Sequence, residues 1–137
     1  MTITATDNSI HTIVVSGSQN ALGGMAMTTS DDSATLLDIS ASNNTIAGGT
    51  FTSTEFSSIN VRMNDWNTLT GVTVTTSQFA QASLDMTGAS NSNSGLTLTG
   101  SGYSMTQISM PAMGYSDTGR IVVSMMADNK VISIPSQ

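Results

Sequence analysis

Asparagine and glycine recur along this 137-residue chain at intervals of about 24 residues. In each repeat the asparagine precedes the glycine by four residues. The pairs are Asn20 and Gly24, Asn44 and Gly48, Asn67 and Gly71, and Asn91 and Gly95, and Gly119 continues the series. Self-similarity at a fixed period is typical of proteins built from stacked repeats. The period therefore limits the fold more strongly than any local motif does.

Within each repeat, apolar and polar residues alternate in short runs bounded by Gly, Asn and Ser. Alternation with a period of two predicts strands rather than helices. The first inward column is expected to contain Ile3, Met27, Phe51, Val74, Leu98 and Val122. A second inward pair is expected at Leu37/Ile39, Val61/Met63, Leu84/Met86, Ile108/Met110 and Ile132/Ile134. An aromatic residue also recurs, at Phe56, Phe79 and Tyr103.

A single repeat is too short to bury a core, whereas stacked repeats share one. The sequence therefore predicts an all-β, single-domain parallel β-helix (β-solenoid) of about six coils. The expected coils are approximately 1–19, 20–43, 44–66, 67–90, 91–114 and 115–137. The interval from Asn44 to Asn67 is shorter than the others by one residue, and the deletion falls in a turn, because Asn64–Trp66 is one residue shorter than Ser40–Asn43. The stacked asparagines and aromatics resemble the internal ladders of right-handed β-helices. The alternative is an antiparallel sandwich, which has no reason to repeat so evenly.

Composition narrows the classes of partner. Charged residues make up 9% of the chain, the net charge is −6, and the cations are Arg62, Arg120 and Lys130. Binding to nucleic acid or to an anionic membrane requires several clustered cations, so we expect neither. The chain has no cysteine, and Met1–Thr6 lacks the basic and apolar regions of a secretory signal peptide.

A Thr-x-Thr pattern recurs in the first strand of each repeat. The middle residue is expected to point inward, so the flanking residues share one outer face. The expected face comprises Thr2, Thr4, Thr28, Thr50, Thr52, Thr73, Thr75, Thr97 and Thr99, with Ala26 in one threonine position. This array resembles the ice-binding face of β-solenoid antifreeze proteins. Threonine is also a favoured strand residue, so a purely structural role is the alternative.

Carboxylates occupy one repeat position in three successive coils, at Asp7, Asp31 and Glu55. Carboxylates one coil apart repel one another unless a cation neutralises them, so Ca²⁺ is the candidate ligand. The alternative is a solvated acidic edge. Asp38, Arg62 and Asp85 share another outward column with alternating charge, which predicts an ion ladder.

The last coil departs from the pattern. With Val122 inward, Ile121 and Val123 are expected to face outward near Met125 and Met126, and exposed apolar clusters usually mark contact surfaces. We therefore expect a homo-oligomer, a trimer in the first instance, or docking to another structural protein. His11 is the one histidine, and its column offers neither a base nor an orienting acid, so no enzyme activity is expected.

The composition is rich in Ser, Thr, Asn and Gly, and resembles that of β-structured phage proteins. This resemblance implies a structural component of the virion surface, such as a capsid decoration, fibre or spike module, without a cofactor. Ice binding is the main alternative. A carbohydrate-binding adhesin, which would be extracellular, is another, and its candidate exposed aromatics are Trp66 and Tyr115.

Overall fold

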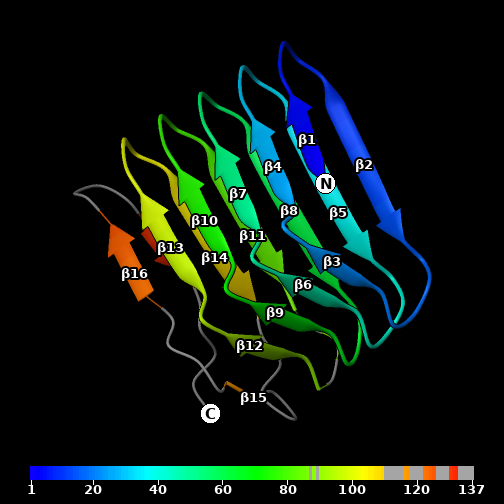
Figure 1. Ribbon diagram of the computed structural model, residues 1–137. Helices are drawn as coiled ribbons and strands as arrows, with labels where there is room; N and C mark the ends of the chain where they lie inside the picture. Colours follow the sequence, from blue (N-terminus) through cyan, green and yellow to red (C-terminus); the bar gives the residue numbers. More distant parts are fainter. Residues whose placement is uncertain (87, 89, 110–115, 118–121, 126–129, 133–137) are drawn as a thin grey trace.

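Three parallel sheets wrap around one core and form a β-solenoid (Figure 1). A computed structural model describes residues 1–86, 88, 90–109, 116–117, 122–125 and 130–132, the last three ranges as backbone only. The chain visits the sheets in the order A, B and C and then returns to A. Every strand pair in the described part of the chain is parallel, which rules out the antiparallel sandwich.

The strands of each sheet stack in chain order. Sheet A contains β1 (Thr2–Ala5), β4 (Ala26–Thr29), β7 (Thr50–Ser53), β10 (Thr73–Thr76), β13 (Thr97–Gly100) and β16 (Val122–Met125). Sheet B contains β2 (Ile10–Val15), β5 (Ala34–Ile39), β8 (Ser58–Met63), β11 (Gln81–Asp85), β14 (Met105–Ser109) and β17 (Lys130–Ile132). Sheet C contains β3 (Ala21–Gly23), β6 (Thr45–Ala47), β9 (Thr68–Thr70), β12 (Ser92–Ser94) and β15 (Ser116–Asp117).

Four complete coils lie within these ranges: β3–β5, β6–β8, β9–β11 and β12–β14. They are preceded by β1 and β2 and followed by β15–β17. The expected number of about six is therefore too high for complete coils. The repeat length expected from the sequence is confirmed, since Thr50 pairs with Ala26 and Thr97 pairs with Thr73. The single shortened interval, from Thr50 to Thr73, is also present.

The core lies inside the solenoid because side chains alternate between its interior and its surface. In β5 every second residue is buried, and Leu37 and Ile39 are fully so. The first inward column, from Met27 and Phe51 to Leu98, is likewise buried. Serine and threonine fill the interior at the corner between sheets A and B, where Thr29 and Thr35 are joined by a 3.0 Å hydrogen bond between their Oγ1 atoms.

Residues with left-handed backbone form the corners. Between sheets A and B, two consecutive residues have positive φ in Asp7–Asn8, Asp31–Asp32, Glu55–Phe56, Gln78–Phe79 and Gly102–Tyr103. The N–H of Phe56 donates to the carbonyl of Gln78 in the next coil (3.1 Å), and that of Phe79 donates to Gly102 (2.9 Å). The backbone ladder thus continues through the turn, along the upper edge of Figure 1.

The repeating asparagines form a ladder at the corner between sheets B and C. The backbone N–H of Asn44 donates to Oδ1 of Asn67 (2.8 Å), and that of Asn67 donates to Oδ1 of Asn91 (2.7 Å). Nδ2 of Asn67 donates to the carbonyl of Asn64 in its own turn (2.9 Å). Each side-chain amide therefore donates to a carbonyl of its own turn and accepts a backbone N–H from the preceding coil. The internal asparagine ladder expected from the sequence is confirmed.

The recurring glycines form the third corner, between sheets C and A. Gly24, Gly48, Gly71 and Gly95 all have positive φ. A Cβ on Gly48 would meet nothing within 4 Å, so the backbone conformation rather than space favours glycine here. The N–H of Gly48 donates to the carbonyl of Thr70 in the next coil (2.8 Å).

The register of the last coil differs from the sequence prediction. Val122 was expected in the column of Leu98, but Leu98 pairs with Val123, and Thr97 pairs with Val122. In sheet B, Ile132 pairs with Gln107 rather than with Ile108. Ser116 still pairs with Ser92 at the usual repeat length. The repeat therefore becomes longer by one residue between β15 and β16. The expected outward direction of Val123 therefore rested on the wrong register.

Candidate functional surfaces

The outer face of sheet A carries two columns of small residues, and in the first five strands of the sheet all of them are threonine except Ala26. The first column contains Thr2, Ala26, Thr50, Thr73 and Thr97, and the second contains Thr4, Thr28, Thr52, Thr75 and Thr99. All of these residues are exposed or half-buried, and strands β1, β4, β7, β10 and β13 hold no charged residue. Members of a column repeat at about 4.8 Å and the two columns lie about 7 Å apart, from strand geometry. The predicted arrangement of Thr-x-Thr motifs is thus present as a regular, neutral array.

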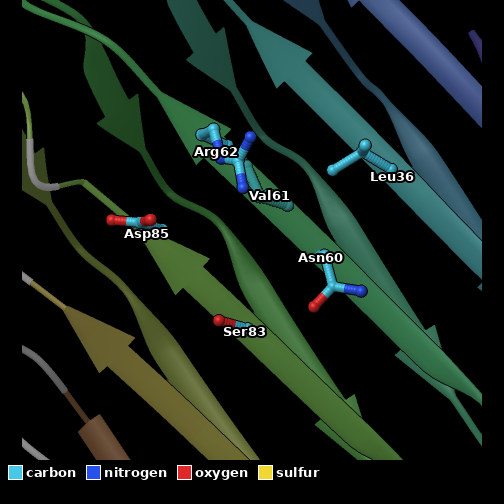
Figure 2. A pocket seen from close by; sticks show the side chains of 6 residues that line it. All are labelled: Leu36, Asn60, Val61, Arg62, Ser83 and Asp85. Atoms are coloured by element: carbon cyan, nitrogen blue, oxygen red, sulfur yellow. The ribbon is translucent and has the colours of Figure 1, made fainter.

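The outer face of sheet B carries the charged column and an open hollow of about 290 Å³ (Figure 2). Its lining residues are Leu36 from β5, Asn60, Val61 and Arg62 from β8, and Ser83 and Asp85 from β11. Arg62 lies in backbone register with Asp38 on one side and with Asp85 on the other, so the charged residues share one column, and the ion pairs across it stay a prediction. The hollow is shallow and open to solvent, which suits a surface contact rather than enclosure of a small molecule.

The acidic column lies on the corner between sheets A and B. Asp31 and Glu55 lie within hydrogen-bonding reach of each other, and this contact lowers the pKa of Asp31 and raises that of Glu55. The Ser30 hydroxyl also donates to Asp31 Oδ2 (2.9 Å) and lowers its pKa further. Among the described residues, no group of three His, Cys, Asp or Glu side chains is arranged to hold a metal ion. The Ca²⁺ site at Asp7, Asp31 and Glu55 stays a prediction.

Beside the acidic residues is a feature that the sequence prediction placed wrongly. Phe56, Phe79 and Tyr103, here called the aromatic column, were expected inside the solenoid but are 67%, 52% and 61% exposed. The rings of Phe56 and Phe79 are stacked with centroids 5.1 Å apart, and those of Phe79 and Tyr103 with centroids 5.4 Å apart. A signal was available in the repeat, because the corresponding residues of the earlier coils are Asn8 and Asp32, which are polar residues typical of turns.

The residues of the aromatic column have left-handed backbone, which lowers the stability of the folded chain. Left-handed backbone costs an ordinary residue roughly 1–2 kcal/mol, and bulky residues rarely adopt it. Each stacked pair returns about 0.5–1.5 kcal/mol. Two stacked pairs return at most about what three such residues cost, and the same turn accepts Asn8 or Asp32 without a ring. The turn therefore does not require the rings, and the exposed column is a candidate contact surface.

The N-terminal end of the described solenoid is a further candidate surface. Strands β1, β2 and β3 are the outermost strands of their sheets and have a neighbour on one side only. Ile10 and Val14 are 81% and 58% exposed, and Ile13 and Val15 are half-buried although the next residues in their columns, Leu37 and Ile39, are fully buried. Apolar side chains and an unpaired strand edge thus coincide at this end.

The predicted assembly interface falls largely outside the described part of the chain. Ile121 and Met126 lie outside the described residues, and Val123 and Met125 are described as backbone in β16. Val123 pairs with Leu98 and Met125 with Gly100, both buried residues of β13. The interface at these four positions stays a prediction.

One of the two aromatics proposed for carbohydrate binding is exposed. Trp66 is 61% exposed and lies in the shortened turn, with left-handed backbone (φ 59°). The N–H of Asn43 donates to its carbonyl (3.0 Å). Tyr115 lies outside the described residues. Of the two aromatics, the structure therefore describes Trp66 alone.

Comparison of the chain with family models, curated proteins and solved structures gives no match. Within the described ranges there is no helix of a length and apolarity that could cross a membrane.

Proposed function

We propose that this protein is a non-enzymatic structural module, a rigid β-solenoid that assembles end to end with another β-structured chain. Such a rod suits a virion surface, as a capsid decoration, fibre or spike component. The observation that carries the proposal is the N-terminal end of the described solenoid, where apolar side chains and unpaired strand edges coincide. Edge strands with free N–H and C=O groups pair readily with further strands, and proteins normally cover or blunt them.

The strand direction indicates which surface would cover this end. All pairs within the sheets are parallel and successive coils advance in one direction, so a coil added before β1 continues the sheets if it runs the same way. The last coil of a second copy meets this condition. The contact would be head to tail, and it gives a ring such as the expected trimer if the rotation closes, and a filament if it does not.

The assembly is tested by placing a charge on the N-terminal end. Ile13 is inward-facing and half-buried in β2, so Ile13→Lys puts an ammonium group into the contact, and a dimer or larger species should become a monomer. Asn60→Lys is the matched control, because this exposed residue lies on the outer face of the same sheet in β8, which is separated from β2 by β5. Multi-angle light scattering at several concentrations gives the mass. A wild-type monomer at high concentration would contradict end-to-end assembly.

Ice binding is the second candidate, favoured by the register of the threonine columns. Thr50, Thr52, Thr73 and Thr75 form two adjacent Thr-x-Thr rungs without a mismatch. A regular, uncharged array fixed on a rigid sheet can hold ordered water at a repeating spacing, as the resemblance to β-solenoid antifreeze proteins implies. The C-terminal continuation is Val122 and Ser124, so a hydroxylated residue persists in the second column.

Thermal hysteresis tests the ice-binding proposal. If the columns bind ice, the wild-type protein should give measurable hysteresis, and Thr52→Tyr with Thr75→Tyr should abolish it, because the rings would hold the flat face away from the crystal. Thr70→Tyr is the control, since Thr70 is exposed on sheet C instead. Absence of hysteresis in the wild-type protein would end this proposal.

A further inference from the structure

We propose that the aromatic column is a docking site for an arginine side chain of a partner protein, which stacks on Phe56 and pairs with the carboxylates beside it. The site lies on the corner between sheets A and B rather than at an end of the solenoid. It therefore adds a lateral interaction surface to the assembly proposed above and does not depend on it.

The stacking leaves one particular ring face free in this column. The rings of Phe56 and Phe79 are parallel within 3° and those of Phe79 and Tyr103 within 8°, so Phe79 is covered on both faces. Phe56 is covered on the side of Phe79, it is 67% exposed, and no ring of a described residue stacks on its other face. In the preceding coil the same turn position is occupied by Asp32, and the N–H of Asp32 donates to the carbonyl of Glu55 (3.2 Å). A flat group on the free face would continue the stack by one step.

The charged residues of the Phe56 turn and of the turn before it select the occupant. Asp31, Asp32 and Glu55 are all exposed, and the carboxyl groups of Asp31 and Glu55 are close enough to hydrogen-bond. A cation between these groups relieves their repulsion. The net charge of −6 attracts a basic partner from a distance.

Among cations, the guanidinium group fits this step best. It is planar, stacks on an aromatic face, and presents paired N–H donors to a carboxylate at the same time. A lysine ammonium group can approach the ring or the carboxylates but has no flat face to stack. A sugar could stack on the ring and donate hydroxyl hydrogen bonds to the carboxylates, but it carries no positive charge to offset theirs, and an aromatic partner would leave the carboxylates unpaired. The combination of Phe56 with Asp32 therefore indicates an arginine-bearing segment.

The test compares fluorescein-labelled hexa-arginine with hexa-lysine by fluorescence anisotropy at low ionic strength. Two variants remove the two parts of the site: Phe56→Asn removes the ring and Asp32→Asn removes a charge. Asparagine tolerates left-handed backbone, so both should keep the turn, which circular dichroism checks. Asp38→Asn is the matched control, because it changes the net charge equally but lies on sheet B.

Hexa-arginine should bind the wild-type protein at least about fivefold more tightly than hexa-lysine, and Phe56→Asn and Asp32→Asn should each weaken it by about fivefold or more. Asp38→Asn should change the affinity by less than about twofold, because exposed charges at a distance are screened. Equal binding of the two peptides, no binding, or an equal loss in Asp38→Asn would overturn the proposal. The peptide comparison needs no variant, so it decides the question even if a substitution perturbs the turn.

Discussion

Replacing Asn67 with leucine is expected to lower the free energy of unfolding by roughly 2–4 kcal/mol, because it leaves a buried N–H without a partner. Asn67 is fully buried, and its Oδ1 accepts the backbone N–H of Asn44, which is itself buried. Its Nδ2 also donates to the carbonyl of Asn64 (2.9 Å). Leucine can make neither bond. For a chain of this size the melting temperature should fall by about 6–12 °C, measured by calorimetry or circular dichroism.

The same substitution at Asn93 should have the opposite sign, which makes it the matched control. Asn93 is 1% exposed, and its Oδ1 and Nδ2 atoms have no hydrogen-bond partner among the described residues. It occupies the inward column of Leu22, Ile46 and Leu69, where leucine is already accommodated. Removing an unsatisfied buried amide should raise stability by about 1–3 kcal/mol. If Asn93→Leu and Asn67→Leu destabilise equally, the asparagine ladder has no special role.

Replacing Phe51 with alanine should have the largest effect among changes of apolar residues, a loss of about 3–5 kcal/mol. Phe51 is fully buried in β7, the third strand of sheet A, and its column contains Met27 and Val74. Neighbouring coils cannot close the space, since their own side chains are fixed by the ladders. The midpoint of guanidinium chloride unfolding, followed by circular dichroism, measures the loss.

Phe56→Ala provides the comparison for this prediction. The residue type is the same, but Phe56 is 67% exposed and contacts one neighbouring ring. Its loss should cost about 0.5–1.5 kcal/mol, the contribution of one stacked pair. Similar midpoints for Phe51→Ala and Phe56→Ala would contradict the assignment of one residue to the core and the other to the surface.

Much of the fold follows from the sequence because each column is repeated several times. Repetition separates inward from outward positions, and it located the deletion in the turn at Asn64–Trp66. It could not show that Gly88 in the next coil lies against this turn. A Cβ at Gly88 would be 2.4 Å from the carbonyl carbon of Asn64, a contact that only the folded backbone reveals.

The register of the last coil shows where repetition stops being informative. Ile121, Val122 and Val123 are all apolar, so any of the three could fill the inward column of Leu98. Strand register is set by a difference between the two faces, and this run offers none. The glycine series, continued by Gly119, indicated Val122, whereas the backbone pairs Val123 with Leu98.

The candidate surfaces were predictable to different degrees. The strand period alone is enough to predict the threonine columns, and the pairing of the strands confirms their register. The aromatic column was misplaced because phenylalanine favours the core on average, and that preference outweighed the turn residues at Asn8 and Asp32 in the same column. The contact between Asp31 and Glu55 depends on side-chain direction, which the repeat does not specify.

The direction of the corner hydrogen bonds has a consequence for synthesis on the ribosome. Each of the three corners contains an N–H that donates to the following coil, as from Asn8 to Asp31, Gly24 to Ala47 and Asn43 to Trp66, beside bonds that run to the preceding coil, such as Ser30 to Ala5. A newly made coil therefore has its corners completed only after the next one has left the exit tunnel. At ordinary translation speeds this delay is roughly 1–5 s per coil. The growing chain should thus always carry one unfinished coil at its C-terminal front, whatever its length.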